Sequence, residues 1–347
     1  MPTGCGAVTA PVQVAVTGAS GYIALHVIAA LLDQGYGVRG TLRDMARGEK
    51  IRAALAKQTE VTGLSFAEAD LMSDQGWDAA LADCQYAMHV ASPVPVVEPK
   101  NHDDLIVPAR EGTLRVLAAA ARAGVQRVVM TSSVAAIGYG HEDKSTFTEA
   151  DWSVVRPEIG AYANSKTIAE RAARDFVAHL PAEQTIEFVT INPSFVLGPL
   201  IDPDGSASIE LVRKLMAREV PGCPKMGFSL VDVRDVAAAH LAAMTSPEAA
   251  GKRYICDTEF QMMAKVAEHL NQTFAPRGYP VRTRELPNWV VRIVALFDPA
   301  VGRIVPELSW RKRYDNTAIR QDLNWHPRAM DETITATGES LIEMGVV

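Results

Sequence analysis

Tyr162 and Lys166 stand four residues apart in an alanine-rich segment that runs from residue 161 to about residue 179. Because four residues make just over one helical turn, both side chains project from the same face of such a helix. A phenol titrates near pH 10, and a neighbouring cation favours the phenolate, which brings the pKa closer to the range useful for proton transfer. Ser133 follows an apolar run upstream and can hold a substrate oxygen beside the phenol. These three residue types suit moving a proton on or off a carbonyl or alcohol oxygen.

A tyrosine and a lysine at this spacing are usually a solvated surface pair, so the surrounding chain must supply the context. The 347 residues suit one large domain or two closely joined domains, and a composition of 48% hydrophobic and 22% charged residues is that of an ordinary globular protein. A net charge of −7 argues against a surface dedicated to nucleic acid or to anionic membranes.

Cysteines and histidines show no metal-binding pattern. The four cysteines, at positions 5, 84, 223 and 256, form no CxxC motif, and we expect mostly buried, reduced thiols. The first eleven residues lack the layout of a signal peptide, and the longest apolar stretch, 289–305, is broken by charges and a proline. We expect that stretch to form a packed helix followed by a turn, and we expect a cytoplasmic protein without metal, nucleic-acid or membrane partners.

A glycine turn joins the first predicted strand to the first predicted helix. The β-branched run 12–16 leads into Gly18 and Gly21, and an amphipathic helix follows. Gly18 permits the tight turn, and Gly21 allows backbone amides to approach a pyrophosphate at the positive helix N-terminus. Ala24 replaces the third glycine and still allows close packing of helix on strand. The spacing is GxxGxxA rather than GxGxxG, and in this context it predicts a dinucleotide-binding loop.

The end of the second predicted strand, 38–42, indicates which dinucleotide is bound. NAD-selective folds place a carboxylate here to bind the ribose 2′-hydroxyl, but this chain has Leu42 followed by Arg43, with Lys50 close behind. A guanidinium and an ammonium group suit a 2′-phosphate, so we expect NADP(H). Asp44 leaves an alternative open, because turned inward it would favour NAD.

Strands and helices alternate regularly as far as residue 196, which predicts an α/β fold with a parallel, doubly wound Rossmann sheet. Further strands are expected at 64–67, 86–90, 127–131 and 186–192, and ligands of such sheets bind at the carboxyl ends of the strands. We expect a dinucleotide-binding domain over 11–196, to which 228–258 returns. The segments 197–227 and 259–347 would form a smaller C-terminal α/β lobe that binds substrate.

In this order and spacing, the motifs make the chain resemble the extended short-chain dehydrogenase/reductase superfamily. Within it, the chain is most similar to the dihydroflavonol reductase group, which includes cinnamoyl-CoA reductases and fungal methylglyoxal/carbonyl reductases. The resemblance covers nearly the whole chain. It rests on Thr17-Gly18-Ala19-Ser20-Gly21-Tyr22-Ile23, Thr41-Leu42-Arg43-Asp44, Ala69-Asp70-Leu71, His89-Val90-Ala91-Ser92-Pro93, Thr131-Ser132-Ser133, Tyr162-Ala163-Asn164-Ser165-Lys166, Asn192-Pro193 with Gly198-Pro199, and Val231-Asp232-Val233-Arg234-Asp235-Val236-Ala237.

The resemblance implies roles for individual residues. Ser133, Tyr162 and Lys166 match the family's catalytic triad, with Tyr162 as the acid and Lys166 also holding the nicotinamide ribose. Arg43 and Lys50 match ligands of the 2′-phosphate, and Asp70 with Leu71 matches the adenine contacts. The remaining cofactor contacts implied are Gly18, Ser20, Gly21, Tyr22, Ile23, Val90, Ala91, Ser92, Thr131, Pro193, Ser194, Val196 and, as a phosphate contact, Ser208.

These observations predict NADPH-dependent reduction of an aldehyde or ketone to an alcohol by a monomer or homodimer. The segment 140–157 does not match the substrate-recognition segment of plant flavonoid reductases, which favours a general carbonyl substrate over a flavonoid. One alternative is an NAD-dependent nucleotide-sugar epimerase or dehydratase, which shares the scaffold. A second is a non-catalytic dinucleotide-sensing regulator, against which the intact Ser133/Tyr162/Lys166 set counts.

Overall fold

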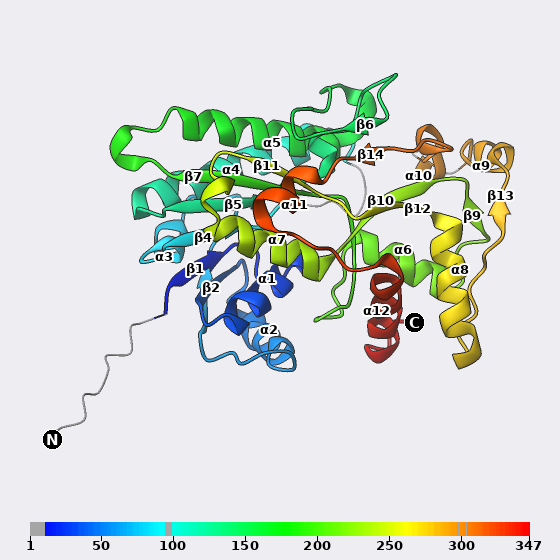
Figure 1. The fold of residues 1–347 in the computed structure, drawn as a ribbon, viewed down its shortest axis with the longest axis horizontal. Helices are drawn as coiled ribbons and strands as arrows, with labels where there is room; N and C mark the ends of the chain where they lie inside the picture. Colours follow the sequence, from blue (N-terminus) through cyan, green and yellow to red (C-terminus); the bar gives the residue numbers. More distant parts are fainter. Residues whose placement is uncertain (1–10, 94–98, 298, 303) are drawn as a thin grey trace.

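The computed structural model describes residues 11–93, 99–297, 299–302 and 304–347; Cys5 lies outside this part. A seven-stranded sheet forms its centre (Figure 1). The strands are β1 (Gln13–Val16), β2 (Gly37–Leu42), β3 (Leu64–Glu68), β4 (Tyr86–His89), β5 (Arg127–Thr131), β7 (Glu187–Pro193) and β11 (Arg253–Cys256). Their order is β11-β7-β5-β4-β1-β2-β3, and every neighbouring pair is parallel. The predicted α/β, doubly wound Rossmann sheet is therefore confirmed.

Helices cover both faces of this sheet (Figure 1). On one face lie α3 (Trp77–Leu81), α4 (Asp103–Ala123) and α5 (Gly160–Ala178), and on the other α1 (Tyr22–Asp33) packs beside α7 (Val233–Thr245). Strand residues alternate between the two layers: Val128 and Met130 join the core under α4, whereas Val129 joins the core under α1. Burial on both faces explains why β5 is apolar without alternation.

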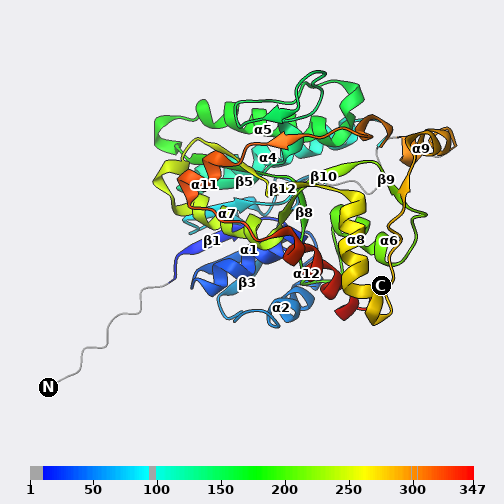
Figure 2. The same cartoon turned by 45° about the vertical axis from the view of Figure 1, so that its right-hand side comes forward.

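A second, three-stranded sheet adjoins the carboxyl ends of the central strands. It contains β8 (Phe195–Leu197), β10 (Gly227–Asp232) and β12 (Glu259–Met262), with β8 parallel and β12 antiparallel to β10. Around it lie α6 (Ala207–Met216), α8 (Met263–Phe274) and α12 (Met330–Glu343) (Figure 2). Their buried apolar residues belong to the same core cluster as those of α1 and α7, so one hydrophobic core runs through both regions.

Short elements complete the chain. The pair β9 (Cys223–Pro224) and β13 (Glu285–Leu286) and the pair β6 (Thr146–Phe147) and β14 (Arg313–Tyr314) are both parallel. The second pair ties the C-terminal part of the chain to the segment between β5 and α5. The remaining helices are α2 (Gly48–Leu55), α9 (Asn288–Val294), α10 (Pro299–Gly302) and α11 (Thr317–Leu323), with 3₁₀ turns η1 (Met45–Arg47), η2 (Val134–Ala136), η3 (Pro157–Ile159), η4 (Ala182–Gln184), η5 (Pro247–Ala249), η6 (Ala275–Arg277) and η7 (Val305–Glu307).

A local expectation differs from the structure. The stretch 289–305, expected to form one packed helix followed by a turn, holds two short helices and the start of a 3₁₀ turn. Cys84, Cys223 and Cys256 are free and buried. Within the described ranges, no helix is long and apolar enough to cross a membrane. The same residues contain no group of three or more His, Cys, Asp or Glu side chains placed to hold a metal ion.

Candidate active site

Helix α5 places Tyr162 and Lys166 on one face, as predicted. The Lys166 ammonium nitrogen lies 5.9 Å from the centre of the Tyr162 ring, and it donates a 3.4 Å hydrogen bond to the Thr131 carbonyl. Lys166 is only 5% exposed, and burial lowers its pKa to about 8, although Glu170 acts in the opposite direction. A lysine that gives up its proton near physiological pH is suited to proton transfer.

The phenol itself departs from the prediction. Burial raises the pKa of Tyr162 above its ordinary value, and the hydrogen bond with Ser133 opposes this rise only in part. Loss of solvent around the ring, and not Lys166, therefore determines the direction of the pKa shift of the phenol. A phenol with a raised pKa stays protonated at neutral pH, which is the state needed to donate a proton.

Ser133 is the serine that faces the phenol. It is the second residue after β5, is 9% exposed, and its hydroxyl accepts a 3.1 Å hydrogen bond from the Ala135 amide in η2. Its hydrogen bond with Tyr162 lowers the pKa of the phenol. Ser132 points instead into the helical layer, where its hydroxyl donates to Glu170 at 2.5 Å. The two neighbouring serines therefore have different partners: Ser133 hydrogen-bonds Tyr162, and Ser132 hydrogen-bonds Glu170.

The glycine turn after β1 forms as expected. Gly18 adopts φ +68°, and a Cβ at this position would lie 3.0 Å from the Cβ of Ala91, so only glycine fits both the conformation and the space. Gly21 caps α1 in an extended conformation, and the first amides of the helix, those of Tyr22 and Ile23, have no carbonyl one turn earlier to bond. This is the arrangement that binds a phosphate group.

A buried histidine connects this turn to the loop after β4, and sequence reasoning did not single it out. His89 lies between two hydroxyls, with Nδ1 3.0 Å from Thr17 Oγ1 and Nε2 3.2 Å from Thr113 Oγ1. Thr17 Oγ1 also accepts a 2.9 Å hydrogen bond from the Ala91 amide. Burial, with Lys166 nearby, lowers the pKa of His89 to about 3, so this histidine is a neutral link that holds the two loops together.

The basic residues after β2 lie in two different environments. Arg43 is exposed, and within the part of the chain that the structure describes its side chain has no hydrogen bond or ion pair. Lys50 pairs with Asp202 at 3.1 Å and lies 3.8 Å from Asp204. Asp44 accepts a 3.0 Å hydrogen bond from the Ala46 amide and caps η1. The carboxylate that would have favoured NAD is thus occupied in a cap.

The other predicted cofactor residues lie mostly at the carboxyl ends of the strands. Val90, Ala91 and Ser92 follow β4, and Pro193 and Ser194 lie at the end of β7. Ser20 lies in the glycine turn, Asp70 caps its own loop through the Met72 amide, and Leu71 packs against Gly112.

The side chains of Thr131 and Ser208 are directed elsewhere. The Thr131 hydroxyl lies 2.7 Å from His240 Nε2 on α7, so only its carbonyl faces Lys166. The Ser208 hydroxyl donates to the Val196 carbonyl at 2.5 Å, which links α6 to β8.

Two groups from the second half of the chain approach the site and carried no sequence signal. Asp257, directly after β11, is 4% exposed, and among the residues that the structure describes its Oδ1 has no hydrogen-bond partner. The same holds for the hydroxyl of Ser194. Burial raises the pKa of Asp257 to about 7. Lys312 lies 3.7 Å from the ring centre of Tyr139, whose pKa is raised by burial, then Glu307 and Tyr162. The segment 307–314 therefore faces the catalytic side of α5.

A doubly wound sheet, a glycine turn and a half-buried Tyr162 beside the buried Lys166 and Ser133 define a dinucleotide-dependent enzyme of the short-chain dehydrogenase/reductase type. Residues 14–256 match the NAD dependent epimerase/dehydratase family, which comprises the extended members of that superfamily, and the chain belongs to this family. The predicted superfamily and its dihydroflavonol reductase-like group are confirmed.

Several similar proteins are reductases. The chain is 35% identical over 255 residues to cinnamoyl-CoA reductase CAD2 of Medicago truncatula, covering 70% of this chain and 76% of that protein. It is 30% identical over 290 residues to an anthocyanidin reductase of Vitis vinifera, covering 79% and 84%. The crystal structure of yeast methylglyoxal/isovaleraldehyde reductase Gre2 complexed with NADPH superposes with a TM-score of 0.79 at 26% identity, covering 96% of this chain and all of that one (100%).

Proposed function

We propose that this protein is an NADPH-dependent reductase that converts an aldehyde or ketone into an alcohol. The observation that carries the proposal is the group of half-buried Tyr162 with buried Ser133 and Lys166 at the carboxyl edge of the sheet, on the same side as the glycine turn. Named relatives that are reductases, and the NADPH held by the yeast neighbour, support the reaction type and the cofactor.

The glycine turn fits a dinucleotide, because the space between Gly18 and Ala91 would be filled by a Cβ and the first amides of α1 point outward from the turn. Arg43 is exposed directly after β2 and, among the described residues, has no ion pair, so it would bind the 2′-phosphate. Lys50 would bind the same phosphate after releasing Asp202, with which it now pairs. Lys166 would hold the nicotinamide ribose.

When bound, NADPH supplies a hydride to the carbonyl carbon. Tyr162, protonated at neutral pH, donates its proton to the carbonyl oxygen, and the Ser133 hydroxyl donates a hydrogen bond to the same oxygen. The Lys166 ammonium stabilises the phenolate left on Tyr162. The substrate would lie between this group and the segments 197–227 and 259–347, with Tyr139 and Lys312 at its edge.

The experiment that tests this proposal follows the absorbance of NADPH and, separately, NADH with a panel of aldehydes, α-ketoesters and aryl ketones. We expect fast oxidation of NADPH by at least one carbonyl and little oxidation of NADH. Absence of turnover with both cofactors, together with NAD that copurifies with the protein, would replace this proposal with the epimerase/dehydratase alternative. Dinucleotide binding without either result would favour the sensor alternative.

A further inference from the structure

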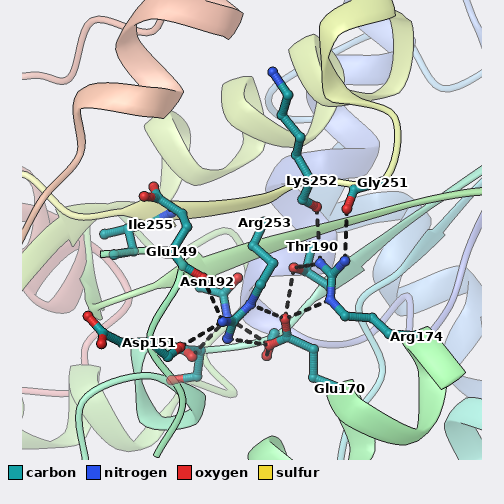
Figure 3. Close-up of polar contacts among 12 residues, drawn as sticks. Glu149, Asp151, Glu170, Arg174, Thr190, Asn192, Gly251, Lys252, Arg253 and Ile255 are labelled. Carbon is teal, nitrogen blue, oxygen red and sulfur yellow. Dashed lines mark hydrogen bonds and ion pairs between the residues drawn. The ribbon is translucent and has the colours of Figure 1, made fainter. Parts of the chain in front are cut away.

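The carboxylate of Glu170 lies at the centre of a buried polar cluster (Figure 3). Glu170 is on α5, four residues after Lys166, and its side chain is fully buried (0% exposed). Three strands meet at this carboxylate, since its partners come from the end of β5, from β7 and from β11. No role in the reaction described above uses it.

One oxygen of this carboxylate reaches the catalytic serine through two neighbours. Oε2 accepts a 2.5 Å hydrogen bond from the Ser132 hydroxyl and a 2.8 Å hydrogen bond from Asn192 Nδ2. Asn192 Nδ2 also donates to the Ser133 carbonyl at 3.1 Å. Ser132 is therefore tied to Glu170 through its hydroxyl, and Ser133 through its carbonyl and Asn192.

The other oxygen anchors the carboxylate. Oε1 accepts hydrogen bonds from Arg253 Nε at 2.6 Å and from Thr190 Oγ1 at 3.0 Å, and Arg174 Nε lies at 3.4 Å. Arg253 is itself held, because its Nη1 donates to the Glu149 and Asp151 carbonyls at 2.8 and 2.7 Å (Figure 3). Its guanidinium also stacks 3.7 Å from the ring centre of Trp152.

Stability alone does not explain such a cluster. Removing two opposite charges from water costs several kcal/mol per ion, and replacing a buried ion pair by apolar residues of the same volume is often neutral or stabilising. A rigid polar cluster does fix positions, however, and here it fixes the end of β5 and the face of α5 that bear the catalytic groups.

We propose that Glu170 is a positioning residue of the reaction, which holds Ser133 through Ser132 and Asn192. Its carboxylate is carried one helical turn after Lys166 on α5, where a negative charge favours the ammonium form of that lysine. This inference rests on the proposed reductase function. Glu170 raises the pKa of Lys166 against the effect of burial. The other groups facing Lys166 are the Tyr162 phenol, the Thr131 carbonyl and the neutral His89, while Arg253 and Arg174 lie against Glu170.

The first test needs no substrate. In the full-length protein labelled with ¹³C at lysine Cε, the Lys166 resonance, assigned by its loss in Lys166→Arg, is titrated with pH. The wild type should titrate near pH 8. Glu170→Gln should titrate about one unit lower, because a facing negative charge is lost. Thr190→Val is the matched control, since it removes a hydrogen bond from Oε1 without changing charge, and it should titrate as the wild type does.

The second test measures single-turnover oxidation of saturating NADPH with the best carbonyl substrate. Glu170→Gln should slow this step by about 10- to 100-fold while changing the Kd for NADPH by less than about 3-fold, because misplacement affects the reacting geometry and not the cofactor loops. Glu170→Asp retains the charge but not the reach, so it should titrate like the wild type and still react slowly.

A Glu170→Gln protein with the wild-type titration and the wild-type rate overturns the proposal. So does Thr190→Val if it is as slow as Glu170→Gln, because the effect would then be general loosening of the cluster. If Glu170→Gln does not fold, the rate of Glu170→Asp tests the proposal instead. A wild-type rate in Glu170→Asp would refute the positioning role of Glu170. A wild-type protein that reduces no carbonyl refutes the proposed function, while the lysine titration still decides whether Glu170 sustains the charge.

Discussion

The Lys166 ammonium lies 5.9 Å from the ring centre of Tyr162, one helical turn away on the same face of α5. Burial acts on the two groups in opposite directions, raising the pKa of the phenol and lowering the pKa of the ammonium to about 8. At neutral pH the pair is thus a protonated phenol beside an ammonium ion. That combination can donate a proton to a carbonyl oxygen and then stabilise the phenolate that remains.

Replacing Tyr162 with Phe should remove the proton donor without altering the fold of the cofactor loops. We expect kcat to fall by about 100- to 10,000-fold, the usual contribution of a positioned general acid. Binding of NADPH, measured by fluorescence titration, should stay close to that of the wild type. Tyr36→Phe is the control, since it also removes a phenol hydroxyl but lies before β2, and it should be fully active. Substantial turnover by Tyr162→Phe would remove Tyr162 from the mechanism.

The rate of reduction should decline as pH rises through about 8, because Lys166 then loses the proton that stabilises the Tyr162 phenolate. Because burial favours neutral lysine, Lys166 loses its charge at a lower pH than an exposed lysine does. Lys166→Arg keeps its charge throughout this range, so its residual activity should decline only at higher pH. Profiles of kcat between pH 6 and 10 measure this, and identical profiles for both proteins would exclude Lys166 as the titrating group.

Selectivity for NADPH should depend on Arg43. A charge-assisted hydrogen bond contributes about 1.5–3 kcal/mol, so Arg43→Ala should weaken NADPH binding by about 10- to 100-fold. NADH, which has no 2′-phosphate, should bind as weakly as before. Lys57→Ala removes a cation from the end of the following helix and serves as the control. Equal losses for both cofactors would mean that Arg43 supports the loop instead of binding the phosphate.

Much of this architecture could be predicted because local chemistry determines it. The apolar runs of the central strands, the glycine turn before α1 and the Tyr162–Lys166 spacing are each readable within a short window. Strand β11, Arg253–Cys256, lies within the segment 228–258 and joins the sheet beside β7. Parallel strand order then places every strand end at one edge, which is where the candidate site lies.

What could not be predicted depends on contacts between distant residues. Strand β14 pairs with β6 across more than a hundred residues of intervening chain, and two-residue strands leave no periodic pattern. Burial of Asp257 and of Glu170 likewise comes from tertiary packing, and a single carboxylate in the sequence does not reveal its surroundings. The raised pKa of Tyr162 has the same origin, because desolvation is a property of the fold and not of the helix that carries the phenol.

Gly18→Ala should impair cofactor binding through a local clash. The added Cβ would lie 3.0 Å from the Cβ of Ala91. The new alanine would also have to adopt φ +68°, which L side chains rarely do. Gly35→Ala is a matched control, because Gly35 has φ +81° but nothing within 4 Å of its added Cβ. Both variants should lose about 1–2 kcal/mol of stability from the left-handed backbone, measured by urea denaturation. Only Gly18→Ala should also weaken NADPH binding, and equal binding by the two variants would show that the turn tolerates a side chain.

Asp257→Asn should stabilise the protein at alkaline pH and not at acidic pH. Burial raises the pKa of this carboxyl from 3.8 to about 7, with a smaller contribution from Glu259. A carboxyl with a raised folded-state pKa contributes stability that is present below the unfolded pKa and is lost as pH rises through the folded pKa. Asparagine cannot ionise, so its advantage over the wild type should grow between about pH 5 and pH 8 and reach at most about 4 kcal/mol.

The free energies of unfolding in urea at pH 5 and pH 8 measure this difference for wild type and Asp257→Asn. Asp175→Asn, an exposed substitution of the same kind on α5, is the control. Its difference in free energy of unfolding from the wild type should be the same at both pH values. If the advantage of Asp257→Asn were the same at both pH values, Asp257 would be ionised throughout, and its unpartnered Oδ1 would have to find a donor that the fold itself supplies. A growing advantage would instead establish that the protein holds a largely neutral acid beside Ser194, at the end of the strand that leads into the proposed nicotinamide site.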